Sequence, residues 1–160
     1  MGRILIAYFS AGGVTAKKAA ELADITKGDL FEIRPEQVYT SADLDWTNRK
    51  SRSSLEMADL SCRPAVAGKV EDMDVYDTVF VGFPIWWYRE PSIIDTFLEE
   101  YDFKGKKIVP FCTSGGSGID GAVERIRRLL GEEVCVDEGR RIGRFGLGSD
   151  LKRWLEGYVQ

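Results

Sequence analysis

The sequence has 160 residues, of which 44% are hydrophobic and 30% charged, a formal net charge of −4 and no histidine. This size and composition predict a single domain, residues 1–160, with a sizeable hydrophobic core. The acidic balance argues against nucleic acid as a partner, and the lack of histidine excludes Ser-His-Asp hydrolases and histidine-ligated metal enzymes in their usual form. Reactivity must therefore come from carboxylates, hydroxyls, backbone groups or a bound cofactor.

Three cysteines, Cys62, Cys112 and Cys135, are scattered along the chain without CxxC spacing. Such a sparse, odd set argues against a disulfide framework or a structural zinc site, so we expect no metal. Cys112 and Cys135 lie in apolar runs and are expected in the core. The sequence has no signal-peptide pattern and no apolar run as long as a membrane span. We therefore expect a cytoplasmic protein with no membrane partner.

The first half of the chain contains two strand candidates, one helix and a long connection. The apolar run at residues 4–9 predicts a strand buried on both faces. Alanines recur at helical spacing over residues 16–23 and predict a helix, and residues 30–33 are a weaker strand candidate. Residues 35–64 are polar, with a weak helical pattern around Leu55. We expect a long connection that contains a helix, and such connections are often functional.

The second half repeats the alternation of strand and helix. Apolar runs at residues 79–83 and 108–112 share the composition of the first strand. A helix is expected to begin near Pro91 between them, and residues 134–136 predict a fifth strand. This alternation predicts a doubly wound α/β fold, in which a five-stranded parallel sheet carries helices on both faces.

Two further helices are predicted near the end of the chain, at residues 119–126 and 151–158. Both have candidate N-cap residues, namely Ser117 with Asp120 in capping-box spacing for the first, and Ser149 or Asp150 for the second. The first helix carries three arginines, Arg125, Arg127 and Arg128. We interpret them as a solvated face, with docking of a partner as the alternative.

Ligands bind to open α/β sheets beyond the carboxyl ends of the strands, where the strand order reverses. The loop after the first strand leads directly into a helix and consists of Ser10, Ala11, Gly12, Gly13, Val14 and Thr15. Its glycines let the backbone turn amide groups inward, the helix N-terminus adds a positive dipole, and two hydroxyls are available as donors. We interpret this loop as a phosphate cradle, with a tight turn before a capped helix as the alternative. It matches neither GxxxxGK[ST] nor GxGxxG.

The loop after the strand at residues 79–83 is aromatic and consists of Pro84, Ile85, Trp86, Trp87 and Tyr88. Three consecutive aromatic residues cannot all point into one core, so some must cover a ligand, a partner or the surface. Flat ligands are recognised by stacking, which contributes about 0.5–1.5 kcal/mol per aromatic pair beyond burial. The alternative is that these rings pack on a neighbouring loop.

The loop after the strand at residues 108–112 is small and polar and consists of Thr113, Ser114, Gly115, Gly116, Ser117 and Gly118. Its glycines can bring backbone N–H groups close to a ligand edge, although a plain flexible turn has the same composition. It is not a nucleophile elbow, because no histidine is available to activate Ser117. The three loops are expected to meet at one edge of the sheet, which makes that edge the candidate binding site.

The segments at residues 8–15, 82–88 and 110–118 resemble the short FMN-binding proteins of the flavodoxin-like family. The resemblance runs from Arg3 to the last helix. It implies the strand order 2-1-3-4-5, with flavin mononucleotide (FMN) as cofactor between the first and third strands. It also implies that the first loop holds the phosphate, that the aromatic loop covers one side of the isoalloxazine ring, and that the third loop lines its other edge.

The chain departs from the family pattern in the phosphate loop. Gly12 and Val14 stand where the family commonly has Thr and Asn. One hydroxyl donor is therefore missing, and phosphate binding is expected to depend on backbone amides and the helix dipole. We expect FMN to bind more loosely here than in the relatives.

The resemblance implies a redox role in which the flavin performs the chemistry and no side chain is catalytic. We favour an electron carrier, a monomer or weak dimer that docks to redox partner proteins. The alternative is an NAD(P)H-dependent reductase of quinones or similar small acceptors, with a second planar pocket formed by residues 39–46, Trp86 and Trp87. A non-redox signalling module such as a receiver domain is the remote alternative. Ser10 and Pro84 stand where receivers need acidic residues and a phospho-accepting Asp.

Overall fold

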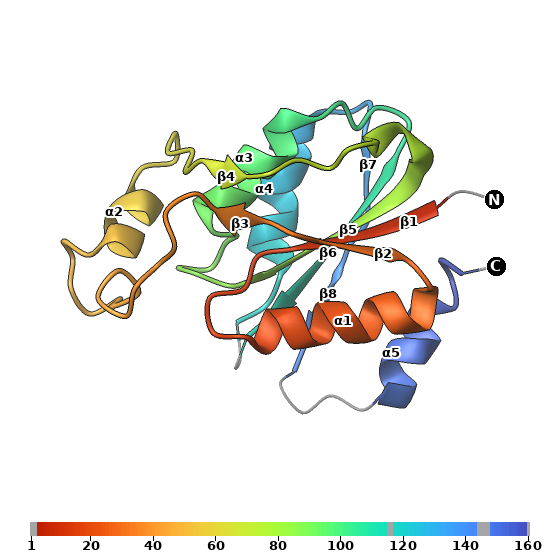
Figure 1. Ribbon diagram of the computed structural model, residues 1–160, viewed down its shortest axis with the longest axis horizontal. Coiled ribbons are helices and arrows are strands. Elements are labelled where there is room, and N and C mark those ends of the chain that lie inside the picture. Colours follow the sequence, from red (N-terminus) through yellow and green to blue (C-terminus); the bar gives the residue numbers. More distant parts are fainter. Residues whose placement is uncertain (1–2, 115–116, 144–147, 160) are drawn as a thin grey trace.

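The computed structural model describes residues 3–114, 117–143 and 148–159 (Figure 1). Within these residues the centre is a parallel sheet with the strand order β2-β1-β5-β6-β7, in which β8 also pairs with β6. The strands are β1 (Arg3–Tyr8), β2 (Asp29–Glu32), β5 (Tyr76–Pro84), β6 (Lys107–Thr113), β7 (Cys135–Val136) and β8 (Arg140–Ile142). The three predicted apolar runs thus form the three central strands, and the predicted doubly wound parallel sheet is confirmed.

The fifth position of the sheet is filled by two short strands in succession. β7 pairs with the beginning of β6, and β8 pairs with its end. The interruption lies opposite Pro110, which has no N–H to give to a neighbouring strand. At the interruption Gly139 has a φ of +72° and passes so close to the Pro110 carbonyl that a Cβ would clash with it. The predicted order 2-1-3-4-5 is therefore confirmed when the strands of this sheet are counted along the chain, except that β7 and β8 together take the place of the single fifth strand.

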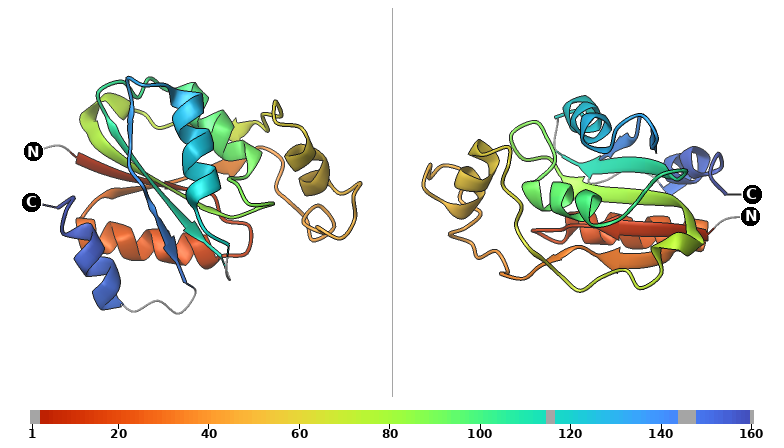
Figure 2. Two further views of the ribbon diagram at one scale, coloured as in Figure 1. Left: turned by 180° about the vertical axis from the view of Figure 1, so that it is seen from behind. Right: turned by 90° about the horizontal axis from the view of Figure 1, so that it is seen from above.

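Helices cover both faces of the sheet, as Figures 1 and 2 show. They are α1 (Val14–Thr26), α3 (Ser92–Glu100), α4 (Asp120–Leu130) and α5 (Gly148–Leu155). One core lies between the sheet and α3 with α4, and a second lies between the sheet and α1 with α5. Adjacent residues of β1 illustrate the alternation, because Leu5 belongs to the first core and Ile6 to the second.

Two predicted caps and one predicted core residue are wrong. α4 begins at Asp120 with Ile119 at its N-cap and no side-chain cap, so Ser117 and Asp120 form no capping box. α5 begins at Gly148, which puts both Ser149 and Asp150 inside the helix and its N-cap outside the described residues. Cys112 is buried as predicted, but Cys135 is exposed because it faces outward from the short edge strand β7, where Val136 takes the inward position.

The long connection contains the predicted helix and a small second sheet. Its elements are β3 (Arg34–Pro35), α2 (Arg52–Ala58), β4 (Val66–Ala67) and a 3₁₀ helix (Met73–Val75). β3 and β4 pair antiparallel and close the connection at its base. Figure 1 shows α2 projecting beyond the carboxyl ends of the central strands. No helix among the described residues has the length and apolar character needed to cross a bilayer.

The close contact between β5 and β6 gives a first prediction. A Cβ on Gly82 would enter the ring of the fully buried Phe111. We expect Gly82→Ala to lower the free energy of unfolding by about 3 kcal/mol in urea denaturation, because a packed ring has no room to move. In Gly143→Ala, where a Cβ would meet no atom within 4 Å, the change should stay within about 0.5 kcal/mol. Equal effects at the two positions would contradict the packing shown here.

Candidate functional site

The three predicted loops come together at the carboxyl edge of the sheet. β1, β5 and β6 are neighbours and run parallel, so the segments that follow them leave from the same edge. The strand order reverses between β1 and β5, since β2 follows β1 on one side and β5 lies on the other. Backbone hydrogen bonds extend the ladder into the loops, from the Phe9 amide to the Gly82 carbonyl (2.9 Å) and from the Ile85 amide to the Thr113 carbonyl (3.4 Å).

The first loop presents free amide groups at the start of α1. Ser10 Oγ accepts a hydrogen bond from the Gly13 amide (3.0 Å), and Gly13 has the left-handed φ of +92° that favours glycine. The Lys17 amide donates to the Gly13 carbonyl, so the amides of residues 14–16 precede the first intrahelical bonds. No side chain caps α1, and its first turn has no acidic residue. This is the arrangement of an anion site.

Thr15 connects the first loop to the third. Its Oγ1 lies 2.7 Å from Oγ1 of Thr113, and both side chains are buried. Either hydroxyl can donate, and whichever accepts keeps its own proton for another acceptor. The predicted hydroxyl of Thr15 is therefore engaged within the protein, whereas Ser10 accepts from an amide and keeps its proton free.

The aromatic loop forms a tight turn of an uncommon kind. The amides and carbonyls of Trp86 and Arg89 bond to each other in both directions, at 3.0 and 3.1 Å. Trp87 and Tyr88 between them have φ angles of +48° and +66°, which defines a type I′ turn. Such turns favour Asn-Gly, because a residue with a Cβ in the left-handed region costs about 1–2 kcal/mol. The loop therefore stores strain, as segments at functional sites often do.

The three aromatic side chains of this turn have different environments. Trp86 packs edge-on against Phe9 and Tyr39, with ring centroids 5.6 and 5.5 Å apart. Trp87 is 45% exposed and Tyr88 78% exposed. Packing on a neighbouring loop, the alternative interpretation, thus holds for Trp86 alone. The other two rings are presented at the surface.

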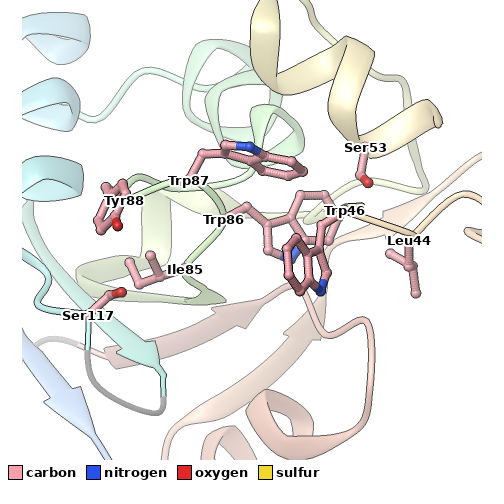
Figure 3. Close-up of a pocket in the computed structure, with 8 residues that line it drawn as sticks. All are labelled: Leu44, Trp46, Ser53, Ile85, Trp86, Trp87, Tyr88 and Ser117. Carbon is pink, nitrogen blue, oxygen red and sulfur yellow. The ribbon is translucent and has the colours of Figure 1, made fainter. Parts of the chain in front are cut away.

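A cavity of about 300 Å³ lies beside the turn (Figure 3). Its lining is mostly aromatic and apolar, with three hydroxyl-bearing side chains, and consists of Leu44, Trp46, Ser53, Ile85, Trp86, Trp87, Tyr88 and Ser117. In Figure 3, Tyr88 and Ser117 lie toward one end and Leu44 and Trp46 toward the other. None of these lining residues carries a formal charge, which suits a flat, largely uncharged ring.

Several predicted site residues do not line this cavity. Pro84 ends β5 and is partly buried. In the third loop, Ser114 Oγ donates to the Ser117 carbonyl (2.5 Å), and a Cβ on Gly118 would meet nothing within 4 Å. Gly115 and Gly116 lie outside the described residues. The structure thus brings the second loop together with Ser117, and no residue of the first loop is among the described residues that line this cavity.

The long connection supplies residues that the sequence did not single out. Leu44 and Ser53 line the cavity, and their positions are linked because the Ser53 amide donates to the Asp43 carbonyl (3.0 Å). Leu44 and Trp46 both lie in residues 39–46, the segment predicted to contribute a pocket. Ser53 had no detectable signal, because it belongs to no motif or periodic pattern.

Arg141 is a further residue that sequence reasoning missed at this edge. It lies on β8, and its Nη1 donates to the Ser114 carbonyl (3.0 Å). The guanidinium thereby supports the third loop from the neighbouring strand. The described residues contain no cluster of three potential metal ligands.

The chain is similar to known proteins in both sequence and fold. A family model described as Flavodoxin matches residues 3–158. A solved structure from Bacteroides eggerthii is 45% identical, covers 100% of both chains and has a TM-score of 0.94. One from Bacteroides uniformis is 42% identical, covers 97% of this chain and 98% of that chain, and has a TM-score of 0.92. Both are described provisionally as flavoproteins.

A more distant structure shares the fold. The flavoprotein of Lactobacillus acidophilus in complex with FMN is 20% identical, with 96% of this chain and 99% of that chain covered and a TM-score of 0.73. None of the curated proteins matches the sequence.

The strained turn gives a second prediction. Tyr88→Gly removes a mostly exposed ring. It relieves about 1–2 kcal/mol of backbone strain, because glycine adopts the left-handed conformation freely. This gain is partly offset by the conformational entropy that glycine loses on folding, about 0.5–1 kcal/mol. We expect the free energy of unfolding in urea to rise by about 0.5–1 kcal/mol. Val38→Gly is the control, because Val38 is similarly exposed and does not have a positive φ; it should lose about 0.5–1 kcal/mol. A loss in both variants would show that the turn is not strained.

Proposed function

The chain belongs to the flavodoxin family, and on this premise we propose that it holds FMN at the carboxyl edge of its sheet and uses it to transfer electrons. Two features of that edge carry the proposal. The uncapped start of α1 suits a phosphate, and the uncharged aromatic cavity suits a flavin ring. The family relationship and the FMN bound to the L. acidophilus flavoprotein support this choice of cofactor.

The residues at this edge fit the parts of FMN. The amides of residues 14–16, with Ser10, would bind the phosphate, an interaction that a helix N-terminus strengthens by about 0.3–1 kcal/mol at exposed sites. Trp87 and Tyr88 are presented for contact with the ring, and each aromatic contact contributes about 0.5–1.5 kcal/mol beyond burial. The third loop would border the edge of the ring. FMN supplies one- and two-electron redox chemistry when bound.

The residues of the first loop also affect the expected affinity for FMN. Gly12 offers no side-chain donor, and a Cβ there would meet nothing within 4 Å. The phosphate would therefore depend on backbone amides and the Ser10 hydroxyl. This supports the expectation that FMN binds more loosely than in relatives with a hydroxyl at the position of Gly12.

Within the redox proposal, the surface around the cavity favours an electron carrier. Trp46, Trp87 and Tyr88 line the cavity and are also exposed, at 74%, 45% and 78%. Exposed aromatic residues around a redox centre provide a surface on which a protein partner can dock.

A reductase of small acceptors is the second candidate. The observation that favours it is the position of Trp46 at the cavity, where its exposed indole could stack on a second planar molecule. The described residues that line the cavity include no Lys or Arg to bind the phosphates of a pyridine nucleotide, so we retain the carrier as the proposal.

Phosphate binding by the first loop gives a third prediction. Gly12→Asp places a carboxylate in the cradle without a steric clash. We expect the Kd for FMN to rise by about tenfold or more, because like charges repel, while the Kd for riboflavin, which lacks the phosphate, stays unchanged. Quenching of flavin fluorescence measures both constants.

Gly143→Asp is the matched control for this experiment, since a Cβ there also meets no atom within 4 Å. It should leave both constants at their wild-type values. Equal weakening of FMN and riboflavin by Gly12→Asp would place the phosphate elsewhere. A protein that is colourless after purification and gains no flavin spectrum with added FMN would contradict the cofactor itself.

The choice between carrier and reductase gives a fourth prediction. In stopped-flow mixing of FMN-loaded protein with NADPH or NADH, we expect flavin reduction slower than about 1 s⁻¹, the lower end of common enzyme turnover. A chemical reductant should bleach the same sample completely and serve as the control. Fast reduction by a pyridine nucleotide without a partner protein would overturn the carrier proposal in favour of the reductase.

A further inference from the structure

Four charged side chains are gathered behind the aromatic turn and form what we call the buried charge cluster, Arg89, Glu90, Asp95 and Arg125. Glu90 and Asp95 are fully buried and Arg89 nearly so. Arg89 and Glu90 follow the turn, Asp95 lies in the first part of α3, and Arg125 reaches in from α4. The sequence analysis interpreted Arg125 as part of a solvated face, and for this residue that interpretation is wrong.

The arginines of the cluster have separate partners. Arg125 donates from Nε to Glu90 Oε2 (3.3 Å) and from Nη2 to Asp95 Oδ2 (2.9 Å). Arg89 donates mainly to carbonyls, those of Glu90 and Met57, both at 3.1 Å. Its guanidinium comes no closer than 3.9 Å to Asp95. Arg125 therefore bridges the two carboxyl groups, while Arg89 ties the turn to the end of α2.

One oxygen of each carboxyl group has no donor. Glu90 Oε1 and Asp95 Oδ1 are buried and have no hydrogen-bond partner among the described residues. The two carboxyl groups nevertheless lie close together, because one guanidinium, that of Arg125, contacts both of them. Two adjacent buried carboxylates repel each other, and each would leave an acceptor unsatisfied. A single proton shared by the two carboxyl groups removes this repulsion and supplies a hydrogen-bond donor where the ionised pair has none.

We propose that Glu90 and Asp95 share one proton at neutral pH, and that this protonated pair holds the strained turn Trp86–Arg89 in place beside the cavity. Both act as positioning residues, since neither lines the cavity. The importance of the turn for binding flavin rests on the proposed function, whereas the sharing of a proton by Glu90 and Asp95 does not.

The other two arginines near the pair, Arg63 and Arg89, make their short hydrogen bonds to other groups. Arg63 lies 3.9 Å from Asp95 Oδ2, but its Nε donates to Glu99 Oε1 at 2.5 Å. Arg89 is bound to carbonyls, which leaves Arg125 as the only near cation that contacts both carboxyl groups among the described residues. Burial, followed by the hydrogen bond to Asp95 and the charge of Asp95, raises the pKa of Glu90 to about 9. Arg125 opposes this increase without cancelling it.

The shared proton has a definite effect on stability. In the unfolded chain Glu90 loses its proton near the ordinary pKa of 4.5, whereas in the folded protein it keeps the proton up to about 9. Between these values the unfolded state binds fewer protons, so the free energy of unfolding falls as the pH rises. The stabilisation that the Glu90 proton provides is complete below the unfolded-state pKa of 4.5, and it is lost as the pH rises through the folded-state pKa of about 9.

The test compares urea denaturation of the full chain, with and without FMN, from about pH 5 to about pH 9. Glu90→Gln cannot ionise, but its amide can donate to the Asp95 carboxylate in place of the shared proton. We expect this variant to lack the wild-type decline in stability over that range and to keep its Kd for FMN within about twofold at neutral pH. Glu99→Gln is the control, because Glu99 is an exposed carboxyl on the same helix, and should keep the decline.

The position of the turn is tested by hydrogen exchange of the Arg89 amide, which bonds to the Trp86 carbonyl. Glu90→Ala should speed this exchange by about tenfold or more at neutral pH, while Glu90→Gln leaves it unchanged. Asp95→Asn is a second variant should Glu90→Gln not fold. It can donate to Glu90 Oε1 and should remove the same decline in stability.

Two outcomes would overturn the inference. A wild-type pH decline retained in both Glu90→Gln and Asp95→Asn would mean that both carboxyl groups are ionised. Unchanged Arg89 exchange in Glu90→Ala would mean that the pair does not hold the turn. Failure of the wild-type protein to bind FMN would instead contradict the proposed function. The urea denaturation without FMN would still show whether Glu90 and Asp95 share a proton.

Discussion

The parallel pairing of three adjacent strands is the constraint on which the rest of this structure depends. β5 pairs with β1 on one side and with β6 on the other; β5 and β6 end level at Pro84 and Thr113, and β1 ends two residues earlier, opposite Gly82. A parallel ladder cannot be closed by hairpins, so the chain must return through helices, and each strand releases a loop at the same edge. The loop before α1, the aromatic turn and the polar third loop leave the sheet at the same edge for this reason. Gly82 keeps the ladder tight by giving the ring of Phe111 room across it.

Local signals in the sequence predicted the central strands, because continuous apolar runs report burial on both faces without knowledge of the neighbours. The errors concern features that only tertiary structure decides. Cys135 lies in an apolar run, yet a two-residue edge strand turns it outward. Arg125 has the spacing of an exposed helical face, and its carboxyl partners are 30 and 35 residues away. The three loops were predictable as a site because topology alone brings them together, whereas Leu44 and Ser53 reach the cavity only through the path of the long connection.

The aromatic turn breaks a local rule, since two bulky residues occupy backbone positions that suit glycine and asparagine. Such violations persist where the surrounding structure determines the conformation. Here Arg89 binds the carbonyls of Glu90, directly after the turn, and of Met57 in α2. Gly121 in α4 has no Cβ, and the Tyr88 carbonyl lies 2.8 Å from the position that a Cβ would occupy. The contacts that hold the turn thus come from α2, α3 and α4, which couples the presented rings to the core behind them.

The break between β7 and β8 affects how the molecule meets its own copies. An open sheet edge is a template onto which a strand from another molecule can add. Here that edge offers a ladder of only two residues and then three, separated by the left-handed backbone at Gly139. The opposite edge is the four-residue strand β2, which has a carboxylate at each end, Asp29 and Glu32. An incoming strand finds no long, flat, uncharged edge, so both sides of this sheet resist the edge-to-edge growth that leads to aggregation.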